Sequence, residues 1–292
     1  GGGGGGGGGD LMDDPFMSLS AATMGAAPAV GGSKIADFTF SVTGATAGAT
    51  AEQIAAWHAR LAVNKEGVLY EDGFLQIGVK TEYNGSKGKV SLFLGNKKQE
   101  AIQGLAVQVG GSSDLTVVVG THGAVIEARQ QMQVTVNVDC MSPFVGALPL
   151  SILMTVGGEN RKLNLSLPVV VTKFVKTVTM TEEEFEKKWE ECVYGGAGVP
   201  LSVVANDKWL KEETLHALLN NGLHCGLVNR PSPSSPSYAA GAFLGASSDE
   251  VLVSLSLDKP SKTFSISVRS NHSNLRDAVE DLLSVILQSG KK

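Results

Sequence analysis

The sequence predicts a mixed fold: an immunoglobulin-like β-sandwich followed by an α+β platform domain, in which helices flank an antiparallel sheet. Seven short segments of alternating apolar and polar residues follow one another between residues 67 and 174, as is typical of a sandwich. After Thr181 the pattern changes to helices that bracket three or four further strands, which favours a separate α+β domain.

This change of pattern divides the 292 residues into three parts. Residues 1–50 form a flexible Gly/Ala-rich hinge, residues 51–175 a sandwich subdomain with a short leading helix, and residues 176–292 a platform subdomain. The chain opens on nine glycines without an initiator methionine, so we expect a fragment of a longer protein. Within the hinge, Asp13-Asp14-Pro15-Phe16 is an acidic turn that presents one aromatic side chain.

The sandwich elements follow from periodicity. A helix is predicted over residues 51–63, because Ile54, Trp57, His58 and Leu61 lie on one helical stripe. Strands are predicted at 74–83, 88–95, 101–109, 114–119, 131–139, 149–156 and 161–169.

The platform elements have clear helix signals. Thr181 and Glu184 form a capping box that opens a helix through about Cys192. A second helix is predicted from about Asp207 to Asn221, ending at Gly222. The remaining predicted elements are strands at 223–229, 238–245, 250–258 and 262–270 and an amphipathic helix at 273–287.

Composition excludes several function classes. The formal net charge is −5 and no Lys/Arg cluster is dense, which argues against nucleic acid and against docking on anionic lipid. No apolar run approaches ~20 residues, so we expect no direct membrane insertion. Cys140, Cys192 and Cys225 are far apart, as expected for reduced thiols of a cytoplasmic protein. Catalytic, cofactor and metal motifs are absent from the sequence, so we expect no enzyme, no cofactor and no metal.

The predicted hairpin from Phe74 to Gly95 carries the strongest functional signal. Alternation places Gly78 and Lys80 on the outer face of its first arm, and Phe93 and Gly95 on that of the second. Matching the core faces across a loop at residues 84–87 sets Gly78 opposite Phe93. An outward aromatic residue flanked by glycines indicates a binding surface where another backbone can lie close, rather than an active site.

Five segments carry a resemblance to a known family: GVLYEDGFLQIGVKTEY, FLGNK, QQMQVTVNVDC, LPVVVTKF and FEKKW, at residues 67–83, 93–97, 130–140, 167–174 and 185–189. Together they resemble the appendage (ear) domain of the alpha subunit of adaptor protein complex 2, the plasma-membrane clathrin adaptor. The resemblance covers about residues 52–290.

This resemblance implies a non-catalytic appendage on a flexible hinge, which collects endocytic accessory proteins by their short linear motifs. A site on the sandwich takes Trp-x-x-Phe peptides, and a site on the platform takes Asp-Pro-Phe/Trp and Phe-x-Asp-x-Phe peptides. The implied location is cytoplasmic, at clathrin-coated pits, through the other subunits of the parent complex and with clathrin only as an indirect partner.

The family's sandwich site maps onto five residues with the family's residue types: Gly78, Lys80, Phe93, Gly95 and Gln131. The resemblance implies that an extended peptide crosses the sheet here. Phe93 and the Lys80 stem would grip the aromatic anchors, and Gln131 would hydrogen-bond the peptide backbone.

The family's platform site is only partly retained. Its central tryptophan maps onto Trp189, which could instead pair with Phe185 in the core of the helix. Glu186 stands where the family has an aromatic residue, and its basic residues map onto Ser256 and Ser265, leaving Arg269. An acidic neighbour maps onto Asp258, and the platform is therefore predicted to be weakened or retuned.

Other interpretations remain open. The chain could be the appendage of another coat complex, either another adaptor large subunit or coatomer gamma, or it could be an enzyme or a secreted sandwich protein. Asp14-Pro15-Phe16 matches the platform's ligand type, so the hinge could compete for a platform.

Overall fold

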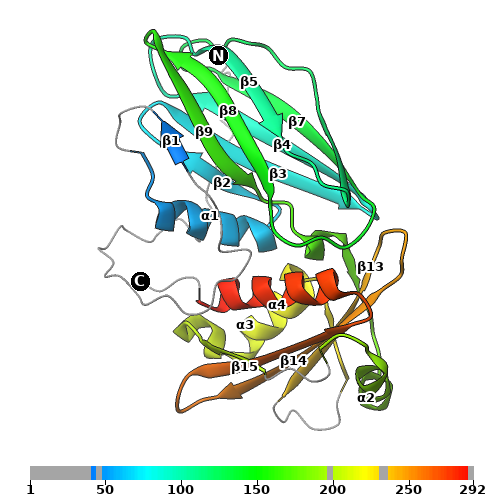
Figure 1. The fold of residues 1–292 in the computed structure, drawn as a ribbon. Helices are drawn as coiled ribbons and strands as arrows, with labels where there is room; N and C mark the ends of the chain where they lie inside the picture. Colours follow the sequence, from blue (N-terminus) through cyan, green and yellow to red (C-terminus); the bar gives the residue numbers. More distant parts are fainter. Residues whose placement is uncertain (1–40, 44–47, 196–199, 230–235, 289–292) are drawn as a thin grey trace, which may run out of the picture. The chain divides into compact units, whose positions relative to one another are not determined.

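The computed structural model describes residues 41–43, 48–195, 200–229 and 236–288 (Figure 1). The chain divides into two compact units, and all described residues belong to the unit that spans Gly32–Lys291. The segment Asp14-Pro15-Phe16 lies outside the described residues.

Two antiparallel sheets form the sandwich (Figure 1). One has the strand order β1-β9-β8-β5 and the other β2-β3-β4-β7-β6. The strands are β1 (Ser41–Thr43), β2 (Glu66–Glu71), β3 (Leu75–Asn84), β4 (Lys87–Asn96), β5 (Gln103–Val109), β6 (Leu115–Val119), β7 (Gln131–Cys140), β8 (Leu148–Val156) and β9 (Glu159–Leu167). Each of the seven predicted strands therefore forms, with ends shifted by no more than two residues.

Helix α1 (Ala51–Val63) forms over the predicted residues. Thr50 and Gln53 make a reciprocal capping box at its start, and Ile54 and Leu61 are buried beneath it. The buried stripe satisfies the helical periodicity, which explains why the sequence predicted this element well.

Two sandwich strands escaped prediction. In β2 the adjacent residues Leu69 and Tyr70 are both fully buried, and the pairing with β3 shifts between Val68 and Tyr70. Such a bulge breaks the two-residue alternation on which strand prediction depends. Strand β1 lies within the predicted hinge, so residues 41–43 of that segment pair with β9 instead of remaining linker.

The platform is an antiparallel sheet with the order β10-β13-β14-β15-β11, and β12 pairs with β13. Its strands are β10 (Val175–Thr177), β11 (Leu201–Val204), β12 (Gly226–Leu227), β13 (Ser237–Phe243), β14 (Glu250–Asp258) and β15 (Thr263–Ser270). Figure 1 shows helix α4 (Ser273–Gln288) on one side of this sheet and helix α2 (Glu182–Glu191) on the other.

The segment between α2 and β13 differs from its prediction. The expected helix at 207–221 is divided into a 3₁₀ turn η2 (Asp207–Leu210), a short α3 (Glu212–Ala217) and a π-turn η3 (Leu218–Gly222). The expected strand at 223–229 shrinks to β12, because His224 has a φ of 57° and cannot join an extended strand. Strands β10 and β11 were also not predicted.

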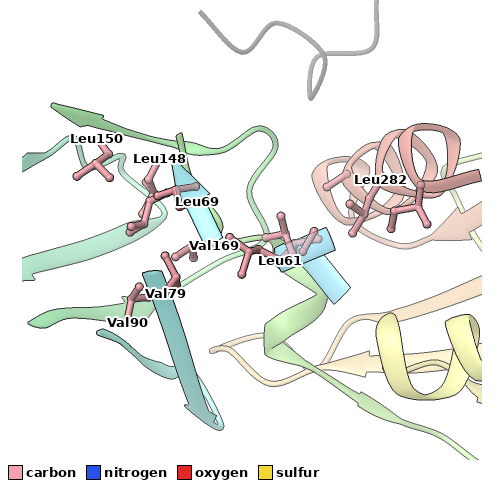
Figure 2. Packing of buried hydrophobic residues seen from close by; sticks show 14 of the residues in the cluster. Leu61, Leu69, Val79, Val90, Leu148, Leu150, Val169 and Leu282 are labelled. Carbon is pink, nitrogen blue, oxygen red and sulfur yellow. The ribbon is translucent and has the colours of Figure 1, made fainter. Parts of the chain in front are cut away.

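One hydrophobic cluster runs through both sheets of the sandwich and into the platform. In Figure 2, Leu61 of α1 lies between sandwich residues such as Leu69 and Leu282 of α4. The connecting 3₁₀ turn η1 (Val171–Phe174) also forms a hydrogen bond with the residue after α1: Lys173 Nζ donates to the Asn64 carbonyl oxygen at 3.1 Å. The sandwich and platform therefore share a core within this unit.

Candidate functional site

The outer face of the β3-β4-β7 sheet carries the five predicted sandwich residues. Gly78 pairs with Phe93, as the matched core faces predicted, and Gly95 pairs with Gln131. Lys80 follows two positions beyond Gly78 on the same face. The structure thus brings the five residues together on three adjacent strands, which we call the sandwich face.

Phe93 lies on this face and not in the core. Its neighbours Leu92 and Leu94 are fully buried on the opposite face of the strand, whereas Phe93 is half-buried. Because successive side chains of a strand point to opposite faces, the Phe93 ring projects outward. An aromatic surface of this kind can pack against an apolar group of a partner.

The two glycines leave room that the fold does not need. A methyl group at Gly78 would make an ordinary contact with Phe93 Cβ at 3.7 Å, and one at Gly95 would lie 3.8 Å from the Gln76 carbonyl oxygen. By contrast, a methyl group at Gly88 would lie 2.7 Å from Tyr83 Cε1. Packing therefore requires glycine at position 88, but not at 78 or 95.

Polar side chains surround the aromatic ring. Lys80 and Gln131 are exposed, and the sequence prediction placed both of them here. Gln133, which pairs with Phe93, was not among the predicted site residues, although alternation places it on the same outer face. Its Nε2 donates to Ser91 Oγ at 3.2 Å, so this amide is held in place beside the ring.

An aromatic stack forms the centre of the platform site. Phe185 is only 2% exposed and stacks on Trp189, with ring centroids 5.3 Å apart, and on Tyr238, with centroids 4.4 Å apart. Trp189 remains partly exposed. Phe185 therefore supports the tryptophan from the core side and does not face solvent itself, while Trp189 both packs against the helix core and reaches the surface.

Arg269 is already engaged by this stack. Its guanidinium lies 4.6 Å from the Trp189 ring centroid, and Nη1 donates to the Trp189 carbonyl oxygen at 2.6 Å. Both contacts use the positive charge that the family resemblance assigns to the acidic part of a ligand.

The remaining predicted platform residues lie apart from the stack. Ser256 and Ser265 pair with each other across β14 and β15, and Asp258 follows on the same face, accepting from Ser261 Oγ at 2.5 Å. Arg269 instead pairs with Leu252, four positions along each strand. At about 3.3 Å per residue, roughly 13 Å separates the serine pair from Arg269. The platform face is therefore divided into an aromatic end and a serine-lined end that carries Asp258.

Chemistry elsewhere in the described part of the chain is limited. The three cysteines are free, and burial raises the pKa of Cys140 and Cys225 to about 12. Burial also lowers the pKa of His58 to about 4. Among the described residues, no group of three or more His, Cys, Asp or Glu side chains is placed to hold a metal ion. None of the described helices is long and apolar enough to cross a membrane.

Comparison with known proteins finds similarity to adaptor subunits. Residues 65–168 match the model of the adaptin C-terminal domain. AP-2 complex subunit alpha-2 of Dictyostelium discoideum is 24% identical over 243 residues, which are 81% of this chain and 24% of that protein. AP-2 complex subunit alpha-2 of Arabidopsis thaliana is 29% identical over 143 residues, which are 49% of this chain and 14% of that protein.

Among solved structures, the crystal structure of a yeast GGA1 GAE domain matches with a TM-score of 0.32 and 16% identity, covering 36% of this chain and 99% of that one. The chain spans about a quarter of the length of the Dictyostelium relative, and less of the Arabidopsis one. The similarity is thus to the adaptin C-terminal domain over residues 65–168, and to alpha subunits of the AP-2 complex over a larger part of the chain.

Proposed function

We propose that this chain is a non-catalytic clathrin-adaptor appendage that recruits endocytic accessory proteins by binding short linear peptide motifs. The sandwich face takes motifs of the Trp-x-x-Phe type. One observation carries this proposal: Phe93 projects from a sheet between two glycines that the fold itself does not require. Space that packing does not need remains available to the backbone of a partner.

An extended peptide would cross β3, β4 and β7. Gly78 and Gly95 let its backbone approach, Phe93 and the Lys80 stem hold its aromatic anchors, and the Gln131 amide hydrogen-bonds its backbone. A Trp and a Phe each bury about 150–250 Å², or roughly 8–12 kcal/mol together at about 25 cal/mol/Å². Association costs about 4–15 kcal/mol, so we expect micromolar binding that several motifs together strengthen.

The platform is proposed to bind Asp-Pro-Phe/Trp motifs only weakly. The serine pair supplies no positive charge, and Arg269 is engaged with Trp189. A hydrogen bond to a charged group contributes about 1.5–3 kcal/mol, so losing two of them would remove most of the affinity for an acidic motif. If Asp14-Pro15-Phe16 competes for the platform, deleting residues 13–16 should raise platform affinity for an added ligand; an unchanged affinity would contradict that competition.

We also propose a hinge in the part of residues 1–50 that precedes β1, a sandwich subdomain at 51–175 that β1 joins, and a platform subdomain at 176–292. The appendage would act in the cytoplasm at plasma-membrane coated pits during clathrin-mediated endocytosis. It would reach them through the other subunits of the parent complex, with clathrin as an indirect partner. The proposal involves no nucleic acid, membrane insertion or cofactor.

Calorimetry with a Trp-x-x-Phe-Asp peptide tests this function. We expect micromolar binding to the unaltered chain and at least tenfold weaker binding to Phe93→Ala, because a central aromatic anchor typically contributes about 2 kcal/mol. Val118→Ala is the matched control, since Val118 is an exposed side chain (57%) on the adjoining strand β6 of the same sheet. No binding to the unaltered chain would contradict the proposal and favour the appendage of another adaptor large subunit or of coatomer gamma.

A further inference from the structure

We propose that the platform binds a basic peptide segment, with an apolar or aromatic anchor beside lysine or arginine, at a surface formed by the last turn of α2 and the residues that follow it. This surface, called the α2 surface, consists of Trp189, Val193 and Tyr194 with Glu186, Glu190 and Glu191. The inference rests on the proposed function as a peptide-binding appendage, and it specifies which peptides the platform selects.

Apolar side chains of the α2 surface are exposed although their backbone is fixed. Val193 and Tyr194 are 73% and 43% exposed. Yet the Val193 amide donates to Asn271 Oδ1 at 3.1 Å, and Tyr194 exchanges backbone hydrogen bonds with Ser270 at the end of β15. Exposed apolar groups on an ordered backbone lose little conformational entropy on binding, which favours a docking role.

Trp189 precedes these residues in the chain and is also held in place. It lies in the last turn of α2, four residues before Val193, and Phe185 and Arg269 hold its ring through stacking and a cation–π contact. Arg269 directly precedes Ser270, which pairs with Tyr194, so the end of β15 brings Trp189 and Tyr194 near each other.

The negative charge of α2 favours a basic peptide at this surface. Six glutamates and two lysines give residues 182–191 a formal charge of −4, and Arg269 on the Trp189 ring offsets one of these negative charges. One of these lysines, Lys188, is paired with Glu250 of β14 at 2.6 Å. Glu186, Glu190 and Glu191 are all exposed. An acidic motif would meet like charge here, whereas a basic one would meet complementary charge.

Three peptides of equal length test the proposal by fluorescence anisotropy with the whole chain. One carries Lys-Pro-Phe-Lys, one carries Asp-Pro-Phe-Asp, and the third is the Trp-x-x-Phe-Asp sandwich probe. We expect the basic peptide to bind at least tenfold more tightly than the acidic one at low salt, with the ratio falling as ionic strength rises.

Charge reversal locates the effect. Glu190→Lys with Glu191→Lys should remove the preference for the basic peptide, and it should preserve the fold, because lysines suit a helix C-terminus. Glu100→Lys with Glu127→Lys, two exposed sandwich positions, is the matched control and should retain the preference. Trp189→Ala should lower the affinity for the basic peptide at least tenfold and leave the affinity for the sandwich probe unchanged.

The outcomes separate the two proposals. Equal or tighter binding of the acidic peptide, or a preference that survives reversal at 190 and 191, would overturn the basic-peptide inference while the sandwich probe still binds. Loss of the sandwich probe alone would overturn the Trp-x-x-Phe function and leave the platform preference supported. If none of the three peptides binds, both are wrong.

Discussion

The sandwich face and the platform face both present an aromatic ring on an antiparallel sheet, but they are built differently. Phe93 and its partners come from three adjacent strands whose pairing sets every neighbour. Trp189 instead belongs to a helix and depends on Phe185 beneath it, on Tyr238 of β13 and on Arg269 of β15. The sandwich face can therefore lose its aromatic ring without losing its shape, whereas the platform site depends on tertiary packing.

Phe185→Ala should give the largest difference between the two faces. This side chain is 2% exposed, so its removal should lower the free energy of unfolding by about 3–5 kcal/mol. Phe93→Ala, at a half-buried outward position, should lower it by less than about 1 kcal/mol. Urea denaturation measures both, and equal losses would mean that Phe93 is a core residue.

Basic residues at the serine pair should restore the positive charge that the family resemblance places at these two positions. Ser256→Arg with Ser265→Arg should raise the affinity for an Asp-Pro-Phe peptide at least tenfold, since a charged hydrogen bond contributes about 1.5–3 kcal/mol. Calorimetry measures the change, and Ser256→Gln with Ser265→Gln adds bulk without charge as the control. The same gain in the glutamine variant would exclude missing charge as the cause of weak binding.

Two glycine variants separate packing from binding within the sandwich. Gly88→Ala should destabilise the chain by about 1–3 kcal/mol, because the new methyl group meets the Tyr83 ring at 2.7 Å. Gly78→Ala should leave the free energy of unfolding unchanged or raise it by about 0.5–1 kcal/mol. It should nevertheless lower the affinity for the Trp-x-x-Phe peptide. Thermal melts and calorimetry test both, and unaltered peptide binding in Gly78→Ala would show that the glycine is not there for a partner's backbone.

The connection between the two faces should affect stability only as a function of pH. Burial, with repulsion from Lys65, lowers the pKa of Lys173 from 10.5 to about 8. The folded chain then releases this proton at about pH 8, whereas the unfolded chain holds it until about 10.5. The free energy of unfolding should therefore rise across that window, by at most about 1.4 kcal/mol per pH unit.

Urea denaturation between pH 7 and 10.5 measures this slope. Lys173→Met should reduce the slope of the unfolding free energy against pH. Lys176→Met, at an exposed lysine three residues later, should leave the slope unchanged. A slope that is the same in both variants would mean that Lys173 is not buried in solution.

Sequence patterns predicted the sandwich face because a single local rule defines it. Alternation in β3 and β4 placed Gly78 opposite Phe93, and the structure confirms that register. The same rule failed in β2, where the bulge buries Leu69 and Tyr70 in succession. It also failed at His224, whose positive φ no periodicity reports.

The platform was less accessible to such reasoning. Nothing in the spacing of Phe185 and Trp189 indicates that Tyr238, about fifty residues later, completes their stack. The commitment of Arg269 to the Trp189 carbonyl oxygen likewise arises from tertiary packing alone. Contacts between distant segments have no local signature, so only the coordinates place them.

The continuous hydrophobic cluster has a practical consequence for anyone dividing this chain. A fragment ending near residue 175 would retain Leu61 on α1 but lose Leu282 and the rest of α4. The apolar side chains that pack against α4 would then be exposed to solvent. Such a truncation should precipitate or self-associate on expression, even though its nine strands remain intact in sequence. The sandwich and the platform thus each bury apolar surface that the other would expose to solvent.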